Sequence, residues 1–145
     1  MTNYNGTDED DIIDASQLNA DIDRIYPGKG NDIITNARSG QTVVSSPGED
    51  TISGSNFDYA LWDAEQAVTI NLKEGWSEDG FGTRDTISDV STIHGSRFGD
   101  TFYGTTNYEK FFANGGNNII DGGGGSDRVS YAPGRGPSTD YEITY

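Results

Sequence analysis

Apolar residues recur every nine positions along the first part of the chain. Large aliphatic residues stand in one phase at Ile25, Ile34, Val43, Ile52 and Leu61. Two positions before them lie Asp23, Asp32, Gln41, Asp50 and Tyr59. Such a run is rare by chance in a chain that is only 32% hydrophobic. A fixed short period indicates a repeat architecture, so we predict a repeat block that covers residues 18–62.

A second block has the same period. Its apolar positions are Phe102, Phe111, Ile120 and Val129, and the positions two before them are Asp100, Glu109, Asn118 and Asp127. Upstream, residues 6–14 repeat the pattern three residues out of phase. We expect a bulge or a longer turn at residues 15–17 to absorb the difference, which would start the first block at residue 6.

These repeats carry a resemblance to a known family. Residues 122–130, GGGGSDRVS, match in full the nonapeptide G-G-x-G-x-D-x-U-x, where U is a large apolar residue. Residues 27–35 follow it closely, whereas Gln41 and Tyr59 replace the acid. The chain thus resembles the RTX, or hemolysin-type, calcium-binding family over roughly three quarters of its length.

The resemblance implies an all-β fold, a parallel β-roll or β-helix solenoid. Each nonamer would turn the chain with six residues and form a short strand with three, and two nonamers would complete one coil. We expect a single domain over residues 1–145, divided into repeat block 6–62, insertion 63–94, repeat block 95–130 and cap 131–145. In the insertion, Val68, Ile70 and Leu72 alternate with polar residues as in a half-buried strand. This insertion is expected to join two short rolls, and the tail to supply a closing strand.

Acids eighteen residues apart are expected to stack on one edge of such a roll, about 4.8 Å from each other. The rule pairs Asp32 with Asp50, Asp100 with Asn118 and Glu109 with Asp127, and across the bulge it places Asp11 on Asp32. The glycine-rich turns would aim backbone carbonyls at a shared point, and carbonyl and carboxylate oxygens suit Ca²⁺. The predicted ligand set is Asp11, Gly28, Lys29, Gly30, Asp32, Gly48, Asp50, Asp100, Glu109, Asn118, Gly123, Gly125 and Asp127.

Some of these acids have an alternative interpretation. Asp and Asn also cap turns without any metal, and for Asp11, Asp100 and Glu109 this alternative is as strong as the metal site. The edge that carries Asp23, Gln41 and Tyr59 is expected to be free of metal. The ligand role of Asp85, whose segment has the shape of a repeat end, stays open.

Charge and composition support a cation as the partner. The chain has 24 acidic and nine basic residues, a net charge of −15, which would repel a nucleic acid. So much charge with so few apolar residues favours disorder unless a bound cation stabilises the fold. There is no cysteine and one histidine, which leaves hard oxygen ligands rather than a thiolate or zinc site.

The predicted function is a calcium-binding module of a larger secreted protein. It would fold on calcium binding and serve export, stability or presentation of a partner domain. The RTX resemblance implies leaderless bacterial export, and the chain shows neither a signal peptide nor an apolar run long enough to span a membrane. No catalytic motif is present, so an enzyme is not expected, and a small polysaccharide lyase or epimerase is disfavoured. His94 is expected to be a polar turn residue.

One alternative function stays open. The chain would then be a carbohydrate- or surface-binding module of an adhesin or a polysaccharide-modifying enzyme. An exposed aromatic face would carry the binding, with Trp62, Trp76, Tyr103, Tyr108 and Phe112 as its candidates. The competing interpretation is that these aromatic residues pack against the roll.

Overall fold

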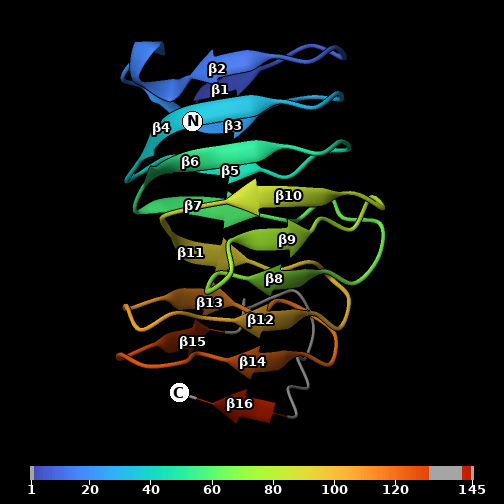
Figure 1. The fold of residues 1–145 in the computed structure, drawn as a ribbon, viewed down its shortest axis with the longest axis vertical. Helices are drawn as coiled ribbons and strands as arrows, with labels where there is room; N and C mark the ends of the chain where they lie inside the picture. Colours follow the sequence, from blue (N-terminus) through green and yellow to red (C-terminus); the bar gives the residue numbers. More distant parts are fainter. Residues whose placement is uncertain (1, 131–141, 145) are drawn as a thin grey trace.

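The protein is a parallel β-solenoid of about seven coils. The computed structural model describes residues 2–130 and 142–144. The coils stack along one axis, with one flattened sheet on each side of a narrow core (Figure 1). The all-β parallel solenoid predicted from the nine-residue period is therefore confirmed. Within the described residues, no helix has the length and apolar character needed to cross a bilayer.

Two sheets contain all of the described strands. Sheet A has seven strands in the order β1 (Thr2–Asn5), β3 (Ile22–Tyr26), β5 (Thr42–Val44), β7 (Phe57–Ala60), β11 (Val90–His94), β13 (Lys110–Phe112) and β15 (Arg128–Ser130). Sheet B has nine strands in the order β2 (Ile12–Asp14), β4 (Ile33–Arg38), β6 (Thr51–Ser55), β10 (Arg84–Ile87), β9 (Trp76–Glu78), β8 (Thr69–Asn71), β12 (Thr101–Tyr103), β14 (Ile119–Asp121) and β16 (Glu142–Thr144).

The core consists of ladders of the large apolar residues that define the repeat. In sheet B, Ile13, Ile34, Ile52 and Ile87 follow one another in register, and so do Ile70, Phe102 and Ile120. In sheet A the ladder runs through Ile25, Val43, Tyr59, Ile93, Phe111 and Val129. Nearly all of these side chains are fully buried, because parallel strands in register place equivalent residues on the same face.

The upstream repeat joins the first block as predicted. Ile13 pairs with Ile34 across β2 and β4. Residues Ala15–Gln17 form a single 3-10 turn, η1, which Asp14 caps by accepting a hydrogen bond from the backbone N–H of Ser16. This turn takes up the three additional residues that shift the phase.

The prediction was wrong at the end of the first block. Tyr59, not Leu61, is the partner of Val43. Ile34 and Ile52 are 18 residues apart, but Thr42 and Asp58 are only 16 apart. The spacing between paired residues shortens by one at a bulge in β4 and by one more at the turn before β7. That turn consists of Asn56 alone, which has φ 53°. Tyr59 therefore points into the core and is fully buried.

The insertion lies within the solenoid and does not separate two rolls. β7 pairs directly with β11, so sheet A continues past it without a break. In sheet B the insertion contributes β8, β9 and β10, and β9 is antiparallel to both of its neighbours. Val68 and Ile70 are buried, as their alternation predicted. Sheet B consequently has two strands more than sheet A.

The last strand extends sheet B. β16 pairs in parallel with β14, and Ile143 lies opposite Ile120. This agrees with the closing strand expected from the tail. The turn predicted at residues 131–141, and Tyr145, lie outside the described residues.

The close stacking of turns predicts a difference between two glycine substitutions. A Cβ at Gly116 (φ +85°) would lie 2.4 Å from the carbonyl oxygen of Phe98 in the neighbouring turn, whereas a Cβ at Gly82 (φ +90°) would meet nothing within 4 Å. Gly82→Ala should cost about 1–2 kcal/mol, the strain of the left-handed conformation, and Gly116→Ala clearly more. Urea unfolding measures both, and equal losses would contradict the stacking.

Candidate metal-binding turns

The acids of the repeat end the turns on both edges of the solenoid. We call the side where the chain passes from sheet A to sheet B the A-to-B edge, and the opposite side the B-to-A edge. The A-to-B edge carries Asp11, Asp32, Asp50, Asp100 and Asn118, and the B-to-A edge carries Glu109 and Asp127. Each acid or amide directly precedes a strand, so the parallel register stacks it on its counterpart in the next coil.

Hydrogen bonds join these residues into ladders. The backbone N–H of Asp11 donates to Oδ1 of Asp32 at 2.8 Å, and that of Asp32 donates to Oδ1 of Asp50 at 2.9 Å. Asp100 donates in the same way to Asn118 at 2.9 Å, and Glu109 to Asp127 at 3.0 Å. All four stacked pairs predicted from the spacing are therefore present. One side-chain oxygen of each acceptor is thereby occupied.

Asp85 continues the first ladder, and the sequence had left its role open. The backbone N–H of Asp50 donates to its Oδ1 at 3.0 Å, and its segment in β10 pairs with β6. The tetrapeptide Asp-Thr-Ile-Ser occurs at residues 50–53 and again at 85–88. This repetition was the signal that could have placed Asp85, although the two copies are 35 residues apart because the insertion lies between them.

A hydroxyl group satisfies the acid in four of the turns. The residue four positions before the acid is Thr7, Ser46, Ser96 or Thr105, and its hydroxyl donates to the carboxylate of Asp11, Asp50, Asp100 or Glu109 respectively. The backbone N–H of Ser96, for example, also donates to Oδ2 of Asp100 at 2.8 Å. These are local caps of the kind that Ser and Thr supply in turns without a metal.

The two remaining acids of the predicted ligand set have glycine at that position. Gly28 precedes Asp32 and Gly123 precedes Asp127, so neither turn has a hydroxyl to donate. Oδ2 of Asp32 and Oδ2 of Asp127 are both buried without a hydrogen-bond partner, and Asp32 as a whole is only 1% exposed. A buried carboxylate oxygen without a partner is costly unless a cation or a proton compensates it.

Glycines of the first of these turns and of the stacked turn of Asp50 lie directly against the adjacent turn. A Cβ at Gly28 would lie 1.9 Å from the carbonyl oxygen of Thr7, and a Cβ at Gly48 would lie 1.8 Å from that of Gly30. Both glycines have positive φ. Backbone carbonyls of adjacent turns therefore lie directly against the glycines around Asp32, and carbonyl and carboxylate oxygens are the ligands that suit a calcium ion. At the other candidate turn, Gly123 and Gly125 likewise face the carbonyls of Thr105 and Asn107.

Burial gives several of these carboxyl groups a raised pKa. Desolvation raises the pKa of Asp50 to about 7, that of Asp85 to about 8 and that of Asp100 to about 6. Desolvation also raises the pKa of Asp32, and the charges of Asp11 and Asp10 act in the same direction. Without a cation, the ladder therefore retains protons at a pH where exposed carboxyl groups are ionised.

A buried polar network surrounds Asp85. The hydroxyl of Tyr59 donates to Oδ2 of Asp85 at 2.6 Å and lies 2.8 Å from Oγ of Ser77. All three side chains are fully buried. The sequence did not indicate this network, because the nine-residue steps had assigned Tyr59 to an edge. In the structure, the displaced register brings the hydroxyl of Tyr59 to Asp85. This hydroxyl donates to the second carboxylate oxygen of Asp85.

The described residues contain no group of three or more His, Asp or Glu side chains placed to hold a metal ion. A cation in these turns would therefore depend on backbone carbonyls for most of its ligands. At the position expected to be metal-free, the Gln41 amide donates to the carbonyl of Ile22 at 3.3 Å and accepts from the N–H of Arg38 at 3.1 Å. That amide needs no cation to be satisfied.

His94 and the aromatic candidates do not form a shared exposed face. His94 ends β11 rather than lying in a turn, stacks on Phe112 at 4.7 Å and contacts Trp62 at 5.3 Å. This group lies on the outside of sheet A. Trp76 and Tyr103 belong to sheet B, and Tyr108 to a turn on the B-to-A edge. The single aromatic face considered from the sequence is therefore wrong.

Searches against protein-family models and against curated proteins found no match for this chain.

The raised pKa values predict how the metal-free protein responds to pH. Because the folded-state pKa of Asp85 lies near 8, above its usual 3.8, its contribution to stability is complete below about pH 4 and is lost as the pH rises through 8. In chelator, the free energy of unfolding should therefore fall from pH 5 to pH 9. Asp85→Asn should reduce this dependence, which urea titrations at several pH values measure. A stability that rises with pH in chelator would contradict the prediction.

Proposed function

We propose that this chain is a calcium-binding module of the RTX type whose folding is coupled to calcium. The observation that carries the proposal is the pair of buried, unpartnered carboxylate oxygens on Asp32 and Asp127. Both occur in glycine turns, and both turns adjoin backbone carbonyls of a neighbouring coil. Calcium supplies the positive charge that these oxygens lack and accepts several further oxygen ligands at the same time.

Two turns are the primary sites in this proposal. In the first, Asp32 with the carbonyls of the Gly28–Lys29–Gly30 segment would hold the ion, together with oxygens of the stacked turns that contain Asp11 and Asp50. In the second, Asp127 with Gly123 and Gly125 would do so beside Glu109. The turn of Asp100, which the hydroxyl of Ser96 closes and which stacks on Asn118, would need calcium least.

The coupling to folding follows from the charge. The chain carries a net charge of −15, and its coils stack acid upon acid. Repulsion between these charges destabilises the folded solenoid when no metal is bound. A cation present at one hundred times its dissociation constant stabilises the folded state by about 2.7 kcal/mol per site. Two such sites would supply about 5 kcal/mol, comparable with the whole stability of a small domain.

A module of this kind suits a larger protein that is exported from a cell. Where calcium is scarce the chain would stay unfolded and could be transported, and in calcium-rich surroundings outside the cell it would fold. It would then support the stability or presentation of a partner domain. We propose this extracellular structural role in place of catalysis, since the paired acids are engaged in the ladders that join the coils.

The direct test is a calcium titration of the full chain. Far-UV circular dichroism should show β structure that increases with calcium and is reduced in chelator at neutral pH, while magnesium at the same concentration should have a much smaller effect, because Mg²⁺ demands a tighter octahedral site. Mass spectrometry under native conditions should count the bound ions. Equal β signal with and without calcium, with no bound ion, would overturn the proposal.

Three matched variants test which turns bind. Asp32→Asn and Asp127→Asn should each lower the number of bound calcium ions by about one, since an amide removes the charge. Asp100→Asn is the control, because Asp100 is as buried as Asp32 but is capped by Ser96, so its calcium count should not change. In chelator, Asp32→Asn should be no less stable than the parent chain, which separates loss of a ligand from damage to the fold. An unchanged count for Asp32→Asn and Asp127→Asn would exclude these turns.

A further inference from the structure

The unequal number of strands in the two sheets opens a groove on the B-to-A edge. β11 and β13 are neighbours in sheet A, one strand spacing apart. The strands that lead into them, β10 and β12, are separated in sheet B by β9 and β8, and so by three spacings or about 14 Å. The turns β10–β11 and β12–β13 must therefore diverge towards sheet B. The β8–β9 turn fills only part of the wedge between them.

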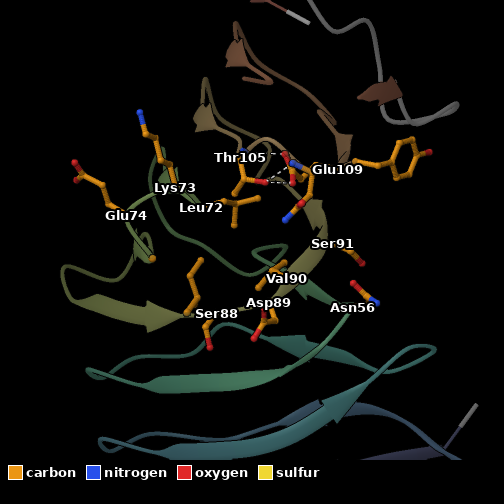
Figure 2. Close-up of a pocket in the computed structure, with 14 residues that line it drawn as sticks. Asn56, Leu72, Lys73, Glu74, Ser88, Asp89, Val90, Ser91, Thr105 and Glu109 are labelled. Carbon is orange, nitrogen blue, oxygen red and sulfur yellow. Dashed lines mark hydrogen bonds between the residues drawn. The ribbon is translucent and has the colours of Figure 1, made fainter. Parts of the chain in front are cut away.

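The wedge contains a cavity of about 360 Å³. Its walls are the turn with Ser88 and Asp89, the turn with Asn107 and Tyr108, and the single-residue turn at Asn56. Figure 2 shows Leu72 and Val90 facing the middle of this cavity, with Asn56 and Ser91 together on one side. A shallower hollow shares Asn56, Ser91, Asn107 and Tyr108 and carries the groove on towards Lys110 of sheet A.

Five uncharged polar side chains of the groove are not engaged with the protein. Asn56, Ser88, Ser91, Asn107 and Tyr108 make no side-chain hydrogen bond within the described residues, in contrast to the acids of the ladders. Tyr108 is 52% exposed, one of the most exposed large side chains of the described part of the chain. Amide and hydroxyl groups that can both donate and accept therefore converge on one cavity beside an accessible aromatic ring.

The charges around the groove favour an uncharged ligand. Both Lys73 and Glu74 extend away from its middle (Figure 2), and Glu74 accepts a hydrogen bond from the indole of Trp76. Glu109 is already bound to Thr105. Once Lys73, Glu74 and Glu109 are set aside, Asp89 is the remaining charged side chain in the lining, and its negative charge would repel an anion. Leu72, Val90 and Tyr108 offer apolar surface beside the amides and hydroxyls.

We propose that this groove binds a neutral saccharide. A sugar ring has a rim of hydroxyl groups that donate and accept, and apolar C–H faces that lie against an aromatic ring or an aliphatic side chain. The cavity is at the small end of the usual range of about 300–1,000 Å³ for ligand sites, which suits one or two rings of a longer chain. The proposal depends on the strand arrangement and not on the calcium function.

The test is a titration of the ¹⁵N-labelled full chain with cellotetraose, xylotetraose and mannotetraose, with tetragalacturonate as the anionic comparison. It is carried out on protein that circular dichroism shows to be folded, so a failure of the calcium proposal leaves it intact. One of the neutral tetrasaccharides should shift the amide signals of Asn56, Ser91 and Asn107, and tetragalacturonate should bind more weakly. No shift with any neutral tetrasaccharide at millimolar concentration, or tighter binding of tetragalacturonate, would overturn the proposal.

A matched pair of tyrosines locates the site. Tyr108→Ala should weaken binding about tenfold, since Tyr108 lines the groove and is 52% exposed. Tyr103, 41% exposed on the outside of sheet B, is a comparable tyrosine away from the groove, so Tyr103→Ala should leave binding unchanged. Asn107→Ala should also weaken binding, which tests the polar wall independently of the aromatic one. Equal effects of Tyr103→Ala and Tyr108→Ala would place binding elsewhere.

Discussion

Parallel stacking at one strand spacing forces like residues onto like residues, and the rest of this structure depends on that constraint. It is favourable for the apolar positions, where isoleucine packs on isoleucine through four coils. It is unfavourable for the acids that end the turns, since equal charges about 4.8 Å apart repel one another. A solenoid with this sequence can form only if its stacked carboxylates are compensated one by one.

The chain compensates them in several ways. A backbone N–H from the adjacent coil occupies one oxygen in each ladder, and a serine or threonine within the turn often occupies the other. At Asp85 the second partner is the buried hydroxyl of Tyr59. Within the described residues, the buried carboxylate oxygens without a partner are those of Asp32 and Asp127, whose turns have glycine at the hydroxyl position. Degeneracy of the repeat thus has a physical meaning, because a serine or threonine in place of glycine closes a turn without a cation.

Much of the fold could be predicted because its period is encoded residue by residue. The inward residues, the stacked pairs and the three-residue shift before Ile22 all follow from counting. The errors occur where the spacing changes: the register shift beside the bulge in β4 and the one-residue turn at Asn56 together move Tyr59 from an edge into the core. The position of the insertion within sheet B depends on which strands pair, and local pattern does not specify pairing across 35 residues. The sequence alone likewise could not show that one oxygen of Asp32 and one of Asp127 lack a partner. The glycine four positions before each acid, which explains this, was already present in the sequence.

The insertion separates two kinds of turn in this molecule: closely stacked turns in the regular coils, and diverging turns that border a cavity. Where coils repeat faithfully, the turns stack so closely that a Cβ on Gly28 or Gly48 would lie 1.9 or 1.8 Å from a carbonyl oxygen of the adjacent turn. Where sheet B gains two strands that sheet A lacks, the turns diverge and a larger cavity opens. Both features follow from the distance between neighbouring coils. It is one strand spacing in the regular coils, and it is larger in sheet B where β8 and β9 intervene. The walls of the groove are turns of the same stack, so the regular coils on either side of the insertion fix the distance between them.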